Sequence, residues 1–219
     1  MAKMPSPTSA HRGSRLSTPR QILGAMGIHD RIVYPFSPKK VVAALHMLAE
    51  LLSSPTRVEH PLLRLKWTMA VFWLADVKHF QRHGHPVTGS RYQAYPQGPV
   101  PCDVLSLIQG NPLWLSELPE TSHCMPYELQ GDCLTRNLRI PFGYDPARFL
   151  GQSEREALET AATKAKNLKL NNRDAALRGE GFQLTPLYQD IPWELLLPAK
   201  MRTREIIDGL ISSARRAVV

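Results

Sequence analysis

A nearly continuous apolar segment between Trp67 and Ala75 is the feature that most limits what this chain can fold into. It lies within a longer stretch, residues 62–81, whose apolar side chains cover almost the whole circumference of a helix. A helix of this kind must be packed on several sides, and Trp67 and Trp73 are expected to be core residues. We therefore expect a compact helical domain built around a central buried helix.

A carboxylate, Asp76, interrupts this apolar segment close to the predicted end of the helix. The helix macrodipole disfavours negative charge near a C-terminus, so Asp76 needs a partner there. Arg91 is the cation that we expect to pair with it, and loop N–H groups are the alternative donors. In either case Asp76 is predicted to hold the following loop in place.

The residues after this helix carry several turn signals. Gly84 predicts the end of the helix, and Pro86 forces an extended path at His85. Further along, Gly89 and the Gly-Pro-Val-Pro sequence at residues 98–101 predict a loop of irregular backbone. The four residues are Gly98, Pro99, Val100 and Pro101.

These residues resemble the Panacea domain, the family of SocA-like antitoxins from toxin–antitoxin systems. Members typically carry a Leu-Ala-Asp helix end, a Gly-x-Pro-Ile/Val-Thr-Gly turn, an aromatic residue and a Gly-Pro-Val-Pro exit. The corresponding residues here are Leu74 to Asp76, Gly84 to Gly89, Tyr92 and Gly98 to Pro101. The combined spacing is far more specific than any one dipeptide in it, and a looser likeness runs from about Pro38 to Trp193.

The resemblance implies the compact fold of the family and the role of an antitoxin that neutralises a co-encoded protein toxin by direct contact.

One position departs from the family pattern. Relatives often carry a His a few residues before the Pro-Trp pair, here Pro192 and Trp193, where this chain has Tyr188 and Gln189. A role that depends on this His is not expected here.

The predicted secondary structure is mostly helical. Ser37 followed by Pro38 is typical of an N-cap and first helical residue, and Ser153 followed by Glu156 has the spacing of a capping box. The expected helices are 38–52, 62–81, 103–109, 153–168, 172–178 and 203–216, and an antiparallel hairpin is expected to join 127–130 to 134–140. The fold class is therefore mainly α, or α+β with one small antiparallel hairpin.

At 219 residues the chain is long enough for one domain with appendages. Residues 1–20 are rich in Ser, Pro and basic residues, which predicts a disordered basic tail. We expect the Panacea-like domain to span residues 21–198 and a C-terminal helical extension to span residues 199–219. The net charge is +8, but four basic residues precede the first acidic one, so half of the excess lies in the opening segment. The rest of the chain shows no stripe of Lys and Arg that would indicate a nucleic-acid-binding face.

Enzyme, metal and cofactor chemistry are all disfavoured by the residue patterns. His79, His83 and His85 are better explained as helix-end residues than as metal ligands, because no Cys or acidic residue completes a ligand set. The three cysteines show no metal-binding or hydrolase spacing and suit a reducing, cytoplasmic environment. The glycines lack the lysine of a phosphate-binding loop, and no apolar run is long enough to span a membrane.

Arg and large aromatic residues on loops beside a rigid helix are typical of protein–protein contacts. We therefore assign toxin binding to five residues, each of which could instead fold back over the core: Arg91, Tyr92, Tyr95, Gln97 and Trp114. The residues expected to support the loop are Asp76, Gly84, Gly89, Gly98 and Pro99.

Two alternative functions remain open. Antitoxins commonly repress their own operons, so the basic tail could bind operator DNA. The chain could also be an adaptor that delivers the toxin to a protease.

Overall fold

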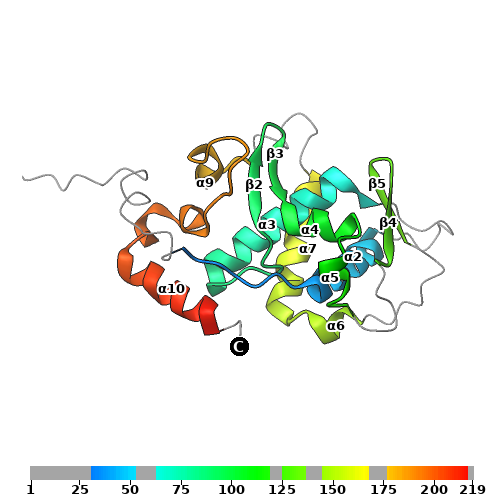
Figure 1. Ribbon diagram of the computed structural model, residues 1–219, viewed down its shortest axis with the longest axis horizontal. Coiled ribbons are helices and arrows are strands. Elements are labelled where there is room, and N and C mark those ends of the chain that lie inside the picture. The colour runs from blue at the N-terminus through cyan, green and yellow to red at the C-terminus, as the bar shows by residue number, and fades with distance from the viewer. Residues whose placement is uncertain (1–30, 53–62, 119–124, 137–144, 168–176, 217–219) are drawn as a thin grey trace, which may run out of the picture.

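The computed structural model describes residues 31–52, 63–118, 125–136, 145–167 and 177–216. Its longest helix is α3 (Leu65–His83), which runs through the middle of the molecule with other elements on both sides (Figure 1). The helix is buried almost continuously from Trp67 to Trp73, as its apolar circumference predicts. A mainly α fold around a central buried helix is thus confirmed.

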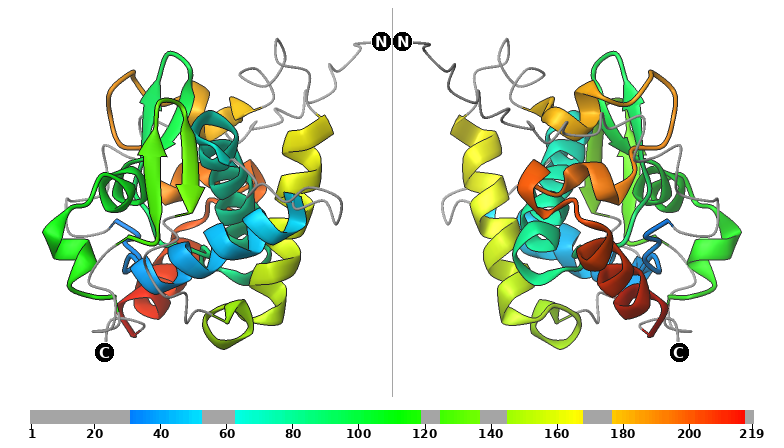
Figure 2. Two further views of the ribbon diagram at one scale, coloured as in Figure 1. Left: turned by 90° about the vertical axis from the view of Figure 1, so that its right-hand side faces the viewer. Right: turned by 90° about the vertical axis from the view of Figure 1, so that its left-hand side faces the viewer.

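Helix α3 divides the core into two clusters. Val71 and Phe72 belong to the first cluster, which contains α2 (Pro38–Leu52) and α7 (Gln152–Asn167). Trp73 and Phe80 belong to the second, in which the C-terminal helix α10 (Arg204–Arg216) buries Ile207, Ile211 and Ala214. Figure 2 shows α2 and α7 on one flank of α3 and α10 on the other. The predicted C-terminal extension therefore packs against the core through α10.

The helix ends follow local sequence signals. Helix α2 begins at Pro38, and the predicted N-cap Ser37 accepts a hydrogen bond from Lys40 N to its hydroxyl group. Helix α3 ends at Gly84, whose φ of 78° is the left-handed conformation that favours glycine. The remaining helices are short: α4 (Cys102–Ile108), α5 (Pro112–Leu115), α6 (Pro146–Phe149), α9 (Glu180–Gln183), η2 (Trp193–Leu196) and η3 (Ala199–Met201).

The capping box predicted for α7 is wrong. The helix starts at Gln152, and Glu154 accepts a 2.9 Å hydrogen bond from Gly151 N. Glu156 accepts a hydrogen bond from the side chain of Gln152 instead, and Ser153 faces His79. A carboxylate two residues earlier than predicted therefore satisfies the backbone at this helix start.

The predicted hairpin is present between β4 (Tyr127–Gln130) and β5 (Cys133–Arg136). Its second strand begins one residue earlier than expected, and residues 137–144 lie outside the described part. A short strand, β1 (Leu63–Arg64), adds to the other edge of β5 and gives the order β1-β5-β4. Gly131, with φ of 63°, forms the turn.

A second hairpin occurs where we expected an irregular loop. Strands β2 (Tyr92–Tyr95) and β3 (Gly98–Pro101) pair antiparallel, with Tyr92 opposite Pro101 and Tyr95 opposite Gly98. The prolines disguise β3 in the sequence, yet an edge strand tolerates residues that donate no hydrogen bond. The prediction of a single hairpin is therefore wrong in number, although the class remains mainly α.

Several predictions fall on residues outside the described ranges, namely the tail at 1–20 and most of the helix expected at 172–178. Among the described helices, none is long and apolar enough to cross a membrane.

Candidate functional site

The carboxylate of Asp76 lies completely buried and organises the loop after α3. Its Oδ1 atom accepts hydrogen bonds from Val87 N and Thr88 N, both at 2.9 Å. Its Oδ2 atom accepts from the hydroxyl of Tyr92 at 2.8 Å and from the hydroxyl of Thr88. Four donors therefore surround a side chain that is 0% exposed. Asp76 is thus bonded to the loop through N–H and O–H groups, which corresponds to the alternative to an ion pair with Arg91.

The predicted ion pair between Asp76 and Arg91 is wrong. Arg91 points outward, with a side chain 62% exposed, and its Nη2 atom lies 3.0 Å from Oδ1 of Asp103. Asp103 also accepts a 2.8 Å hydrogen bond from Arg91 N. Near neighbours with N–H and O–H groups satisfy the buried carboxylate without the cost of burying a second charge.

Burial raises the pKa of Asp76 to about 6, while hydrogen bonds from Thr88, Tyr92 and Val87 act in the opposite direction. Desolvation disfavours the charged carboxylate, and the hydrogen bonds favour it. The loop therefore depends on a group whose ionisation state changes at mildly acidic pH.

Further contacts fix the loop against α2 and α4. Ser37 N donates a 2.9 Å hydrogen bond to Thr88 O. The hydroxyl of Ser90 accepts hydrogen bonds from Asp103 N and Val104 N, which are at the start of α4. The loop is thus joined to three helices.

Gly89 is required by both space and backbone conformation. Its φ is 73°, and a Cβ atom at this position would lie only 2.1 Å from the carbonyl oxygen of Pro35. By contrast, a Cβ atom at Gly98 would meet nothing within 4 Å, although its φ of 124° also favours glycine. Gly98 therefore serves the backbone alone, whereas Gly89 also allows a close approach of two chain segments.

Tyr92, which we assigned to toxin binding, is buried. Its ring lies 4.9 Å from Trp73 and 6.0 Å from Trp193 between ring centroids. Its hydroxyl binds Asp76, so it supports the loop and has no free surface for a partner. The alternative of folding back over the core holds for this residue.

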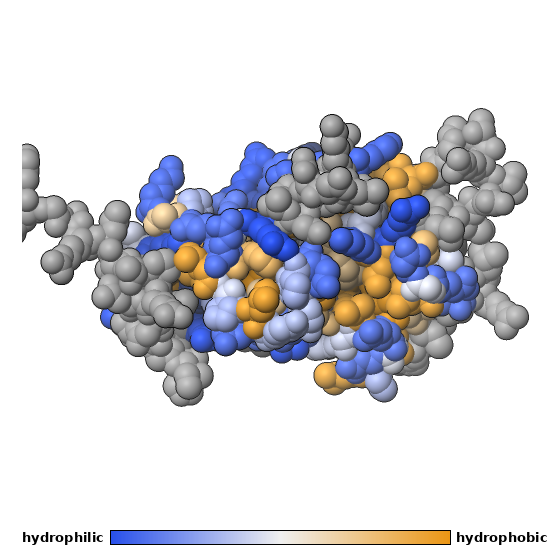
Figure 3. All heavy atoms as spheres, turned by 90° about the horizontal axis from the view of Figure 1, so that it is seen from above, coloured by the Kyte–Doolittle hydropathy of each residue, from blue (hydrophilic) through white to orange (hydrophobic). Residues whose placement is uncertain are grey.

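Tyr95 and Gln97 lie at the outer end of the hairpin, where Tyr95 is half-buried and Gln97 is exposed. The ring of Tyr95 makes an edge contact with Tyr188, with 5.3 Å between centroids. Tyr188 is 63% exposed and its neighbour Leu187 is 49% exposed. We call Tyr95, Gln97, Leu187 and Tyr188 the hairpin surface. The face that holds the hairpin turn and α9 carries apolar side chains between polar ones (Figure 3).

The segment that carries Tyr188 pairs with the outer edge of β2. Tyr188 N donates to Ala94 O at 2.6 Å, and Ala94 N donates to Gln189 O at 3.0 Å. Tyr188 has a φ of 64°, a conformation that is unfavourable for a residue with a large side chain. Sequence reasoning noted Tyr188 only as a departure from the family pattern and missed it as a surface residue, since the contact spans more than 90 residues.

Trp114 lies away from the hairpin turn. It is half-buried on α5 and packs edge-on against Phe36, with 4.8 Å between ring centroids. The hairpin turn and α5 are at opposite ends of the region around α4 (Figure 1). The five residues assigned to toxin binding therefore do not form one surface.

The three histidines at the end of α3 do come together. The ring of His79 lies 4.5 Å from that of His83 and 4.7 Å from that of His85, centroid to centroid. However, His79 Nδ1 donates to the backbone oxygen of His85, and Nε2 lies 3.1 Å from the hydroxyl of Ser153. Within the described ranges, no group of three or more His, Cys, Asp or Glu residues is arranged to hold a metal ion.

Residues 69–172 match the sequence model of the family described as antitoxin SocA-like, Panacea domain. These residues, a little under half of the chain, are similar to a Panacea domain. The match covers the buried carboxylate, its loop and the β2–β3 hairpin, which are the residues on which the resemblance was based. No curated protein and no solved structure gives a significant match to the chain.

The Panacea match ends before the segment around Tyr188 and before α10. Half of the hairpin surface, Leu187 and Tyr188, therefore lies outside it. Tyr95 and Gln97 lie inside the match, and Leu187 and Tyr188 come from the C-terminal region that the match does not cover.

Proposed function

We propose that this protein is an antitoxin that neutralises a cognate, co-encoded protein toxin by binding it through the hairpin surface. The family match supports a role in a toxin–antitoxin system in general. The single observation that carries the finer proposal is the exposed contact between Tyr95 and Tyr188 on a hairpin that is braced from inside. Tyrosine pairs of this kind contribute large contact area with few rotatable bonds.

The hairpin surface is fixed before any partner binds. Asp76 and Tyr92 hold the base of the hairpin, and the backbone hydrogen bonds of Ala94 hold its edge. At the turn, Arg178 donates a hydrogen bond to Pro96 O. Because little ordering is required on association, more of the contact energy is available for affinity.

In this proposal the protein is not an enzyme and acts stoichiometrically in the cytoplasm. Covering the working surface of the toxin, or clamping it in an inactive conformation, would be sufficient for neutralisation. Arg91, exposed at the base of the hairpin and paired with Asp103, would lie at the polar rim of the contact.

The test is co-expression with the product of the neighbouring gene, scored by growth of the host. The double variant Tyr95→Ala/Tyr188→Ala should lose protection while its melting temperature changes little. The matched control is Leu113→Ala/Leu129→Ala, which removes two exposed apolar side chains from α5 and β4. This control should protect like the wild type.

Equal protection by both double variants would refute the hairpin surface as the contact. Protection that is lost in cells lacking a particular protease would favour the adaptor alternative. A sequence-specific gel shift with the operon's own promoter that persists without residues 1–20 would favour the DNA-binding alternative.

A further inference from the structure

A cleft of about 370 Å³ lies between α3, α7 and the segments at 177–181 and 195–198. Its floor is apolar, with Trp73, Leu74 and Val77 from α3 on one side. Leu177 and Leu196 face them from the other side. The volume is within the range of small-molecule sites, and the cleft is separate from the hairpin surface.

The backbone oxygens beside the cleft are already hydrogen-bonded. Trp73 Nε1 donates to Leu177 O at 3.1 Å, and Gln81 Nε2 donates to Leu196 O at 2.6 Å. Each of these acceptors therefore already has a donor from the protein. A polar ligand that needs to donate hydrogen bonds gains little from this part of the cleft.

Arg202 satisfies two more carbonyl groups in the same way. Its Nε atom donates to Leu197 O at 2.9 Å, and its Nη2 atom donates to Leu195 O at 3.0 Å. The same guanidinium pairs with both oxygens of Glu180, at 3.1 and 2.8 Å. The acidic group that lines the cleft is thus neutralised by a neighbour, and Arg202 itself is used by the fold.

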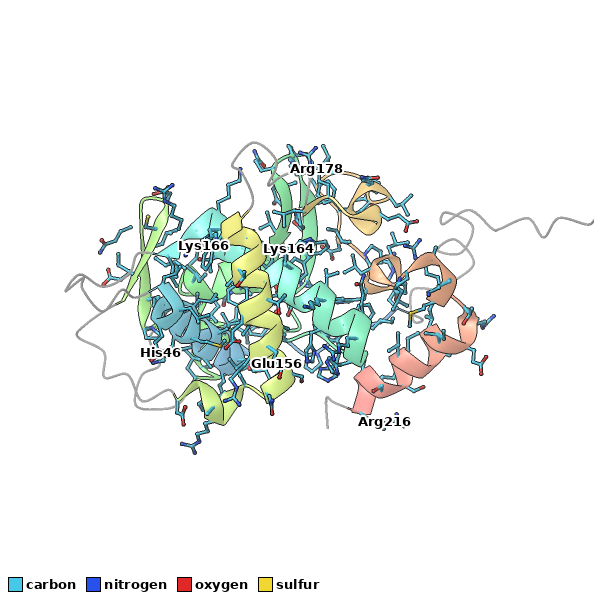
Figure 4. All side chains as sticks on the ribbon, turned by 180° about the vertical axis from the view of Figure 1, so that it is seen from behind. His46, Glu156, Lys164, Lys166, Arg178 and Arg216 are labelled. Atoms are coloured by element: carbon cyan, nitrogen blue, oxygen red, sulfur yellow. The ribbon has the colours of Figure 1, made fainter. Side chains whose placement is uncertain are left out.

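Two lysines remain at the rim. Lys78 on α3 and Lys164 on α7 line the cleft and are exposed. In the described part of the chain, neither has an acidic partner within ion-pair distance. Lys164 and Lys166 lie on opposite sides of α7 (Figure 4), because residues two apart on a helix point in nearly opposite directions. Only Lys164 of these two lines the cleft.

We propose that this cleft binds a small organic anion with an unbranched apolar tail, such as a medium-chain carboxylate. The apolar floor would hold the tail, and Lys78 and Lys164 would attract the carboxylate at the rim. The lining residues of α3 extend from Trp73 to Gln81, about 12 Å along a helix axis. This length suits a chain of about eight carbons. The proposal is independent of toxin neutralisation.

The test is calorimetric titration of the full chain with octanoate, and with octan-1-ol as the uncharged analogue. The wild type should bind octanoate saturably with one site and bind octan-1-ol about tenfold more weakly, a difference of about 1.4 kcal/mol. The variant Lys78→Glu/Lys164→Glu should lose at least about tenfold in octanoate affinity. The control Lys39→Glu/Lys166→Glu changes the net charge equally at exposed helical positions that do not line the cleft, and should bind like the wild type.

A second variant tests the location. Thr160 lies on the exposed side of α7 and lines the cleft, so Thr160→Trp should fill it without disturbing the core. Octanoate binding should then be abolished while the melting temperature is retained. Equal binding of octanoate and octan-1-ol, unchanged binding by Thr160→Trp, or equal losses in both charge variants would overturn the proposal. Failure of the wild type to bind octanoate would also overturn it, and loss of toxin neutralisation in Thr160→Trp would then favour a protein contact at the cleft.

Discussion

The hydroxyl group of Tyr92 donates a 2.8 Å hydrogen bond to Oδ2 of Asp76 in the interior of the protein. This bond joins the C-terminal half of α3 to the first residue of β2. The same carboxylate binds the backbone of Val87 and Thr88, so one buried charge fixes both the loop and the hairpin. The position of the exposed part of the hairpin therefore depends on the ionisation of Asp76, a buried side chain that a partner protein cannot contact.

The variant Asp76→Asn should change how stability depends on pH. The pKa of Asp76 is about 6 in the folded state and 3.8 in the reference state, so between these values the folded protein binds more protons. Its contribution to stability is complete below pH 4 and is lost as pH rises through 6. Asparagine has no such loss, and the Thr88 and Tyr92 hydroxyls can accept from its amide group. The variant should therefore gain about 3 kcal/mol relative to wild type between pH 4 and pH 7.

Urea unfolding of both proteins from pH 4 to pH 7 measures this difference. Comparison with the variant is needed because burial lowers the pKa of His79, which has the opposite effect on stability in acid. Parallel stability curves for the two proteins would contradict the assignment. Asp76→Ala is the control for hydrogen bonding, because it leaves four donors without an acceptor and should destabilise the fold at every pH.

The helices could be predicted because their signals are local. The start of α2 at Pro38, the end of α3 at Gly84 and the span of α10 each follow from residues within one or two turns. The β2–β3 hairpin could not be predicted, because prolines obscure β3 and β2 is completed by a segment more than 90 residues away. Strand pairing over such a distance leaves no periodic pattern in the sequence.

Only part of the candidate site could be predicted, because only some of its signals are local in the sequence. The need of Asp76 for a partner follows from its place on an apolar helix, but the identity of the donors depends on the path of the loop. Charge alone suggested Arg91, which in fact pairs with Asp103. A buried group that needs hydrogen-bond partners can thus be recognised in the sequence. The partners themselves are harder to predict.

Gly89→Ala should destabilise the protein much more than Gly131→Ala. Both glycines have positive φ, 73° and 63°, so both substitutions add backbone strain of about 1–2 kcal/mol. Only at Gly89 would the new Cβ atom collide with a backbone atom, Pro35 O. Urea unfolding of the two variants separates the collision from the strain. Equal losses of stability would show that the backbone near Pro35 moves aside easily.

Asp103 should contribute more to stability than its partner Arg91. Because the Arg91 side chain is 62% exposed, Arg91→Ala should cost no more than about 1 kcal/mol. Asp103→Ala should cost about 2–3 kcal/mol, because it also removes the acceptor for Arg91 N at the base of the hairpin. Thermal unfolding of both variants tests this asymmetry. Equal effects would mean that the exposed ion pair, and not the backbone hydrogen bond, is the important interaction.

Substitutions of Tyr188 should separate stability from function. Its φ of 64° is unfavourable for any residue with a Cβ atom, so Tyr188→Gly should be about 1 kcal/mol more stable than Tyr188→Ala. Both variants lose the ring that contacts Tyr95, and both should neutralise the toxin equally poorly. Chemical unfolding and co-expression growth assays give the two readouts. If Tyr188→Gly protected cells fully, the ring would have no part in binding. If it were less stable than Tyr188→Ala, the backbone at this position would not be strained, because relief of a strained φ can only favour glycine.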